Sequence, residues 1–183
     1  MFNRTPYGGK VDAEDTRWLE PEELEAWLAY VATTTLLEGE LDRQLQRDAG
    51  MPHAYYQILA MLSEVPDRTL RMSELAAVTQ SSQSRLSHAV ARLERRGWVR
   101  RSPCPDDRRS TFCTLTEQGF RALAAAAPQH VATVRKHLID RLTPEQITQL
   151  RDICRAVLGS LGVDPGRALA PAALVEAEQR RGA

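Results

Sequence analysis

The segment from Ser82 to Arg96 has the residue pattern of a helix with one apolar and one polar side. Leu86, Val90 and Leu93 recur at the spacing that places side chains on one helix face. The opposite face carries Ser84 and His88, and Gln83 and Ser87 flank it. Hydroxyl, amide and imidazole groups on an exposed helix can form hydrogen bonds with base edges in the major groove of DNA. The sequence therefore predicts a recognition helix with these four residues as base contacts.

The same segment carries side chains that suit phosphate groups. These are Ser82, Arg85, Arg92 and Arg95. A guanidinium group is always charged, and phosphate contacts position a protein on DNA without reading its sequence. We predict that these four residues are phosphate contacts. The alternative is an ordinary solvated helix face, which is less favoured because a basic hairpin follows directly.

Two short runs with strand character, 98–102 and 111–115, flank a segment rich in proline and aspartate. Asp107, Arg108 and Arg109 are expected at the tip of this hairpin. An inserted arginine suits a narrow minor groove, where the potential is negative, and Asp107 would orient Arg109. The sequence predicts a basic wing for the minor groove. The alternative is a solvent-exposed ion pair in a turn.

These functional side chains need a framework of short helices. Ser73 is expected to cap a short apolar-faced helix that stops by Gln80. A tight turn then leads into the predicted recognition helix, which Gly97 ends. Two short helices joined by such a turn form a helix-turn-helix motif.

Longer helices are predicted before this motif. Residues 21–48 have apolar positions three and four apart, after a proline and two glutamates that favour a helix start. A second helix is expected from about His53 to about Val65, followed by a short strand at 69–71.

Two further helices are predicted after the motif. Thr116 opens an alanine-rich helix that passes Pro128 with a kink and ends near Asp140. A capping box at 143–146, with proline in the first helical position, opens a last amphipathic helix that runs to about Leu161.

The net charge is zero, but charge is segregated along the chain. Between Asp12 and Asp48 there are eleven acidic and three basic residues, a net charge of −8. Between Ser81 and Arg109 there are eight basic and three acidic residues, a net charge of +5. The first segment would repel a phosphate backbone and the second would attract it.

Five motifs together resemble the MarR family of bacterial winged-helix regulators, over about residues 18–161. They are Ser73-Glu74-Leu75-Ala76, Ser82-Gln83-Ser84, Arg92-Leu93-Glu94-Arg95-Arg96-Gly97-Trp98-Val99, Asp107-Arg108-Arg109 and Leu115-Thr116-Glu117-Gln118-Gly119. The resemblance implies an obligate homodimer formed by the first and the last two helices. It also implies that Arg109 enters the minor groove.

The fold class that follows is mainly α, a winged helix-turn-helix with a small β wing, dimerised through N- and C-terminal helices. We expect an N-terminal tail at 1–17, a regulator domain at 18–161 and a C-terminal tail at 162–183. Within the domain, the expected parts are a DNA-binding winged helix at 52–119 and dimerisation helices at 21–48 and 117–161. A two-fold dimer would read the two half-sites of a palindromic operator.

The function predicted is sequence-specific regulation of transcription, as a homodimeric repressor that a small molecule releases. Aromatic residues occur in helices that surround a ligand cleft in the family resembled, which points to a small aromatic or phenolic effector. The candidates are Trp18, Tyr30, His53, Tyr55 and Tyr56. The alternative for each is a role in the core or in the dimer interface.

Two other functions remain open at this stage. Cys104 and Cys113 lie on opposite arms of the predicted hairpin, so they could approach as a redox-active pair in a thiol-responsive regulator. A winged-helix protein-interaction module without DNA binding is the second, but it has no need of both a basic recognition face and wing-tip arginines.

Several other classes of protein are not expected. The sequence has no glycine-rich phosphate loop, Gly-x-Ser-x-Gly or His-Glu-x-x-His motif, so we predict neither an enzyme nor a cofactor. His130 and His137 alone would make a poor zinc site, so no metal is predicted. No apolar run suits a membrane span, and a cytoplasmic protein without membrane contact is expected.

Overall fold

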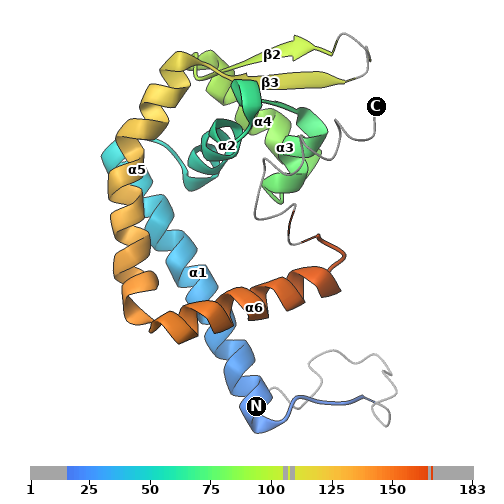
Figure 1. Ribbon diagram of the computed structural model, residues 1–183, viewed down its shortest axis with the longest axis vertical. Coiled ribbons are helices and arrows are strands. Elements are labelled where there is room, and N and C mark those ends of the chain that lie inside the picture. Colours follow the sequence, from blue (N-terminus) through green and yellow to red (C-terminus); the bar gives the residue numbers. More distant parts are fainter. Residues whose placement is uncertain (1–15, 105–106, 108–109, 165, 167–183) are drawn as a thin grey trace, which may run out of the picture. The chain divides into compact units, whose positions relative to one another are not determined.

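Six α-helices and three short strands make up the described part of the chain, which in this computed structural model is residues 16–104, 107, 110–164 and 166 (Figure 1). The helices are α1 (Pro21–Ala49), α2 (His53–Ser63), α3 (Met72–Val78), α4 (Gln83–Arg95), α5 (Glu117–His137) and α6 (Pro144–Ser160). The strands are β1 (Thr69–Arg71), β2 (Val99–Pro103) and β3 (Thr111–Leu115). Short 3₁₀ turns occur at η2 (Pro66–Arg68) and η3 (Ile139–Arg141). The chain divides into two units, 1–39 and 40–183.

The N-terminal unit contains the first part of α1. Pro21 takes the first position of the helix, where its missing N–H is not needed, and the Glu20 N–H donates to Glu23 Oε2 at 2.9 Å. The rings of Trp27 and Tyr30 stack with centroids 6.2 Å apart, and both side chains are exposed. The expected start of this helix is therefore confirmed.

The strands form one antiparallel sheet in the order β1-β3-β2 within the larger unit. In the register, Leu70 lies opposite Cys113 in the β1 pair, and Arg101 lies opposite Cys113 in the β2 pair. Leu70 and Cys113 are buried, so this face of the sheet packs on the helices. Strands β2 and β3 project together as the predicted hairpin beside α3 and α4 (Figure 1).

One hydrophobic core holds together the sheet, the end of α1 and helices α2 to α5. It takes Leu45 from the end of α1, Leu59 and Leu62 from α2, and Leu75 from α3, each with no exposed surface. Helix α4 adds its apolar side, and α5 contributes Leu123 and Ala126. Helices α2 to α4 are short, so burial of these side chains rather than helix propensity stabilises them.

The predicted helix-turn-helix is formed by α3 and α4. Ser82 caps α4, because its Oγ accepts the Arg85 N–H, and Gly97 follows the helix with a φ of +71°. The prediction that Ser73 caps α3 is wrong, because that helix begins at Met72. The Glu74 carboxylate binds the Arg71 N–H at 2.7 Å and so organises the first turn one residue earlier.

The base of the wing is joined tightly to the start of α5. Thr116 Oγ1 donates to the Gly97 carbonyl at 2.6 Å and accepts the Gly119 N–H at 3.0 Å, so one side chain binds the end of α4 and caps α5. A Cβ placed on Gly119 would lie 2.1 Å from the Trp98 carbonyl oxygen. Only glycine allows this approach.

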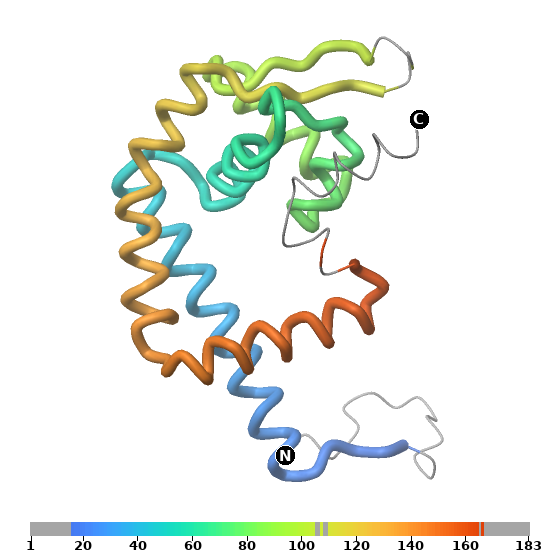
Figure 2. Tube along the Cα trace, in the orientation of Figure 1, coloured from blue at the N-terminus to red at the C-terminus, as the bar shows by residue number. Residues whose placement is uncertain are grey.

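Helix α5 continues past Pro128 as a single helix and ends at His137 (Figure 2). The expected end near Asp140 is wrong by one turn, because η3 follows instead. Helix α6 begins with the predicted capping box, in which Thr143 Oγ1 accepts the Gln146 N–H and the Gln146 side chain binds the Thr143 N–H. Of the described helices, none has both the length and the apolar character needed to cross a membrane.

Candidate nucleic-acid interface

Helix α4 buries its large apolar side chains and exposes the predicted base contacts. Leu86, Val90 and Leu93 are at most 1% exposed. All four predicted base contacts, Gln83, Ser84, Ser87 and His88, are exposed. The polar side of the helix is therefore open to a partner, while the apolar side fixes the helix to the core.

The predicted phosphate contacts Ser82, Arg85, Arg92 and Arg95 lie on the same helix and its cap. All four of these side chains are exposed. Arg92 and Arg95 border a pocket of about 360 Å³ whose other side is the junction of α1 and α2, including Gly50 and Pro52. The wing lies on the other flank of α4, where Gln83 and Ser87 are found. One flank of α4 thus carries arginines, and the flank beside the wing does not.

Arg96 was not singled out by the sequence, and it differs from the arginines before it. Its Nη1 donates to the Gly50 carbonyl at 3.1 Å, and its guanidinium carbon lies 4.9 Å from the centroid of the Trp98 ring. The end of the recognition helix is therefore attached to the α1–α2 junction. Only the position of Arg96 at the end of the predicted helix could have indicated such a role.

An ion pair joins α4 to the wing. Arg101 of β2 binds the Glu94 carboxylate through Nε at 2.9 Å, through Nη2 at 2.6 Å and through its backbone N–H at 3.0 Å. These hydrogen bonds from Arg101 hold the pKa of Glu94 below its ordinary value. Sequence reasoning missed this pair because its members are seven residues apart, across the turn between a helix and a strand.

The tip of the wing is only partly described. Arg108 and Arg109, the predicted minor-groove contacts, lie outside the described residues. Asp107 is exposed, and its carboxylate accepts a hydrogen bond from Ser110 Oγ at 2.6 Å. The base of the hairpin is formed by the pairing of β2 and β3, so the expected wing is present up to Cys104 and from Ser110 onward.

The two wing cysteines do not form the pair considered from the sequence. Cys113 lies opposite Arg101, whereas the Cys104 N–H donates to the carbonyl of Ser110, three residues before Cys113. Both thiols are free and buried. Burial, together with the nearby Glu94 carboxylate, raises the pKa of Cys113 to about 12, so this thiol is a poor nucleophile at neutral pH.

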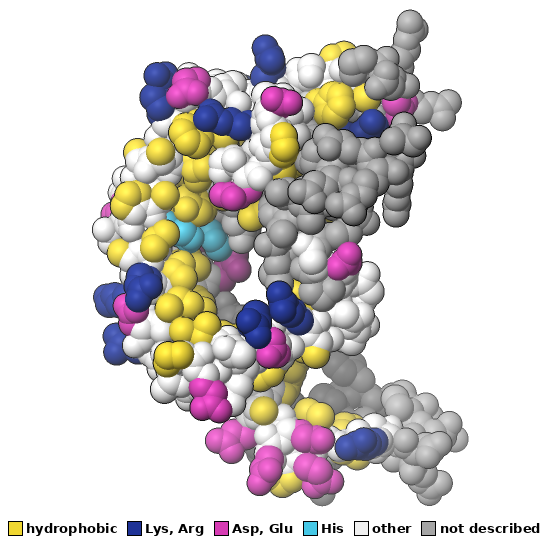
Figure 3. All heavy atoms as spheres, viewed as in Figure 1, with side chains coloured by type: hydrophobic (Ala, Val, Ile, Leu, Met, Phe, Trp, Pro, Cys, Tyr) yellow, Lys and Arg dark blue, Asp and Glu magenta, His cyan; other side chains and the backbone are white. Residues whose placement is uncertain are grey.

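Three of the predicted effector residues lie on α2. His53 and Tyr55 are buried, and the half-buried Tyr56 ring lies 4.1 Å from the ring of His130 on α5. Burial raises the pKa of Tyr56 and lowers the pKa of His130, which the neighbouring His53 lowers further. Histidine side chains bordered by hydrophobic ones are visible on one face of the molecule (Figure 3).

The other two effector candidates, Trp18 and Tyr30, belong to the N-terminal unit and are exposed. Within the described ranges, no group of three or more histidine, cysteine or acidic side chains is arranged to hold a metal ion.

Comparisons with known proteins bear on this arrangement. A model of the MarR family matches residues 49–110, a range that contains all of α4 and β2. Sco3205 of Streptomyces coelicolor, a MarR family transcriptional regulator solved in complex with DNA, is 55% identical. Its structure aligns with a TM-score of 0.78 over 80% of this chain and 92% of its own.

Two further relatives agree with this match. AbsC of Streptomyces coelicolor, a MarR family transcriptional regulator, is 42% identical with a TM-score of 0.76 over 80% of this chain and 98% of its own. The transcriptional repressor MprA of Escherichia coli (strain K12) is 29% identical over 69% of this chain and 70% of its own length. These proteins are named as regulators, in agreement with the expectation that the chain is not an enzyme. With a helix-turn-helix, a paired-strand wing and more than half of its aligned residues shared with Sco3205, the chain belongs to the MarR family of transcriptional regulators.

Proposed function

We propose that the chain represses transcription as a homodimer whose two α4 helices bind the half-sites of a palindromic DNA operator. One observation carries the proposal: every polar side chain predicted to contact bases is exposed on α4, and the same helix is fixed to the core by three buried residues. Support comes also from Sco3205, which was solved with DNA, and from MprA, which is named a repressor.

Base reading is assigned to Gln83, Ser84, Ser87 and His88, with Ser82, Arg85, Arg92 and Arg95 on phosphates. Arg108 and Arg109 would enter the minor groove, with Asp107 beside them. The division follows the chemistry of the groups, because amides, hydroxyls and imidazoles discriminate base edges, whereas exposed arginines bind phosphate regardless of sequence.

The operator sequence has to be determined first. Fragments of genomic DNA that the purified protein retains would give its sequence, with two half-sites about 10 base pairs apart for a two-fold dimer. His88→Ala should then relax the base preference, with a loss of about 1–3 kcal/mol on the selected fragment and a smaller loss on a scrambled one. An equal loss on both fragments would make His88 a phosphate contact.

The wing is tested separately. Arg109→Ala should weaken binding to the selected fragment without changing the melting temperature, because Arg109 is predicted to supply a charge to the minor groove and not to the core. Unchanged affinity at physiological salt would remove Arg109 from the interface.

The dimer would be formed by the helices at the two ends of the chain. Large apolar side chains are exposed on α1, including Trp27 and Leu36, and on α6, including Ile153 and Val157. A monomer would leave this surface in water, and a second copy would cover it. Sedimentation of the full chain should give twice the monomer mass, and Ile153→Asp should shift it toward the monomer.

Release by a small aromatic or phenolic molecule completes the proposal. The candidate contacts are the aromatic side chains of His53, Tyr55 and Tyr56 on α2, and of Trp18 and Tyr30 in the N-terminal unit. A panel of phenolic acids, screened for loss of fluorescence anisotropy of the labelled operator, would identify an effector. The thiol-responsive alternative loses its chemical basis, because Cys104 and Cys113 are both buried and separated in the register.

A further inference from the structure

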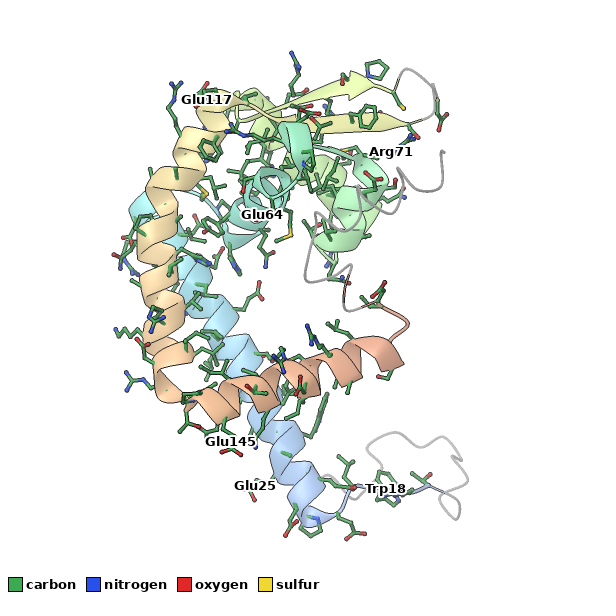
Figure 4. All side chains as sticks on the ribbon, in the orientation of Figure 1. Trp18, Glu25, Glu64, Arg71, Glu117 and Glu145 are labelled. Atoms are coloured by element: carbon green, nitrogen blue, oxygen red, sulfur yellow. The ribbon has the colours of Figure 1, made fainter. Side chains whose placement is uncertain are left out.

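A cleft of about 380 Å³ lies between α4 and the wing. Its walls come from three places in the chain. Arg71 and Ser73 lie at the start of α3, Gln83 and Ser87 lie on the flank of α4 beside the wing, and Ser110 and Thr111 lie at the start of β3. Arg71 is located between α3 and the wing strands (Figure 4). The cleft is therefore bordered by the two elements that the proposed function assigns to DNA.

The geometry of duplex DNA indicates which part of a bound duplex would lie over this cleft. A major groove and the minor groove next to it share one phosphate strand as their common wall. If α4 occupies the major groove and the wing enters the adjacent minor groove, that strand has to pass between them. It would pass over the cleft.

The lining has the chemistry that a phosphate strand requires. Ser73 and Thr111 supply hydroxyl donors, and two arginines border the cleft, Arg71 and Arg101. Arg101 is held by Glu94. Among the described residues, no carboxylate forms an ion pair with the Arg71 side chain, whose guanidinium lies 5.5 Å from the Phe112 ring centroid.

We propose that this cleft binds the DNA phosphate strand shared by the two grooves, with Arg71 as its cationic contact. The proposal rests on the proposed function and adds to it a binding residue outside both the recognition helix and the wing tip. Phe112 orients the Arg71 guanidinium, and the backbone N–H of Arg71 is occupied by Glu74, so only the side chain is available to DNA.

Salt dependence measures binding to phosphate directly, because each neutralised phosphate releases condensed counterions. Arg71→Gln should reduce the slope of log affinity against log salt by about 0.9 for each phosphate that is no longer neutralised, hence by nearly 2 for a two-fold dimer. The weakening should be equal on the selected operator and on a scrambled duplex, because a phosphate carries no sequence information. Arg71→Lys, which keeps the charge, should restore the slope.

Arg121→Gln is the matched control. It removes the same charge from an exposed position on α5, and its slope should stay that of the wild type. An Arg71→Gln slope equal to that of Arg121→Gln would overturn the proposal. Weaker binding to the operator alone, with an unchanged slope, would also overturn it, because it would make Arg71 a base contact.

Uncharged methylphosphonates placed one at a time along the operator locate the phosphate that Arg71 binds. On the strand between the two grooves, one such substitution should weaken the wild type and leave Arg71→Gln unaffected. If every substitution affects both proteins alike, Arg71 does not bind a phosphate there. If the wild type binds neither duplex, the proposed function itself fails. That result differs from one in which the wild type binds DNA and substitution of Arg71 has no effect.

Discussion

At the scale of single residues, Gly119 is a position where the structure leaves no room for a side chain. Gly119→Ala should destabilise the fold by about 3 kcal/mol or more, because its new Cβ would collide with the Trp98 carbonyl, which is backbone and cannot turn away. Thermal melting measures the destabilisation. Gly159→Ala is the control, since nothing lies within 4 Å of a Cβ in that helical position, and alanine there should stabilise by about 0.5–1 kcal/mol. Equal melting temperatures for the two variants would contradict the close approach.

The cysteines should differ strongly in reactivity. Cys154 on α6 is exposed, whereas Cys104 and Cys113 are buried and the pKa of Cys113 is raised to about 12. At neutral pH, iodoacetamide should therefore modify Cys154 first and the wing thiols only after denaturation, as peptide mass spectrometry would show. Rapid labelling of Cys113 in the native protein would revive a thiol-responsive mechanism. Cys154→Ser provides the background for that measurement.

At the scale of elements, the packing of α2 against α5 should depend on pH. Burial beside His53 and Tyr56 lowers the pKa of His130 below 6.5, so below that pH the unfolded chain binds a proton that the folded chain excludes. The stability that neutral His130 permits is complete above pH 6.5 and decreases as the pH falls toward the folded pKa. Urea unfolding at a series of pH values measures this.

Two variants separate His130 from other titrating groups. His130→Gln cannot be protonated, so its stability should change less than that of the wild type on acidification through this range. His137→Gln, on the exposed side of the same helix, is the control and should keep the wild-type dependence. Parallel curves for the wild type and His130→Gln would show that His130 is not the group responsible.

Local signals explain which elements could be predicted from the sequence. Ser82 begins α4 through its side-chain hydroxyl, and Gly97 and Pro144 end or begin helices through their backbone preferences. A few neighbouring residues therefore suffice to place α4 and α6. The prediction that Ser73 caps α3 was wrong because a serine is also tolerated inside the first turn of a helix. The competing hydrogen bond from the Arg71 backbone to Glu74 depends on geometry. Residue types and their spacing were enough to predict the helices whose ends carry such signals.

Interactions between elements were harder to predict. The roles of Arg71 and of the Glu94–Arg101 pair depend on how the wing packs against α3 and α4. The separation of Cys104 from Cys113 depends on a strand register that hairpin length alone does not fix. The exposure of the candidate base contacts could thus be predicted, because they lie on one helix. The candidate site could not be predicted where several elements meet.

At the scale of the whole molecule, net charge is a poor guide to DNA binding. The basic segment 81–109 has a net charge of +5 although the chain is neutral, so a duplex would meet mainly positive charge. With about 6–10 phosphate contacts, a dimer should lose roughly 10³- to 10⁵-fold in affinity between about 50 and 200 mM salt. Anisotropy titrations on the operator measure this. Tight binding with a flat salt response would contradict direct phosphate contacts.

The division of α4 into buried and exposed sides has a consequence for how such a regulator acquires new targets. The side chains assigned to bases take no part in the core, and those in the core do not face the solvent. A lineage could therefore exchange Ser84 or His88 and gain a different operator while the fold keeps its stability. Gene duplication followed by drift at these few positions would be enough to separate two regulatory circuits. The same freedom makes the helix a practical starting point for designed genetic switches.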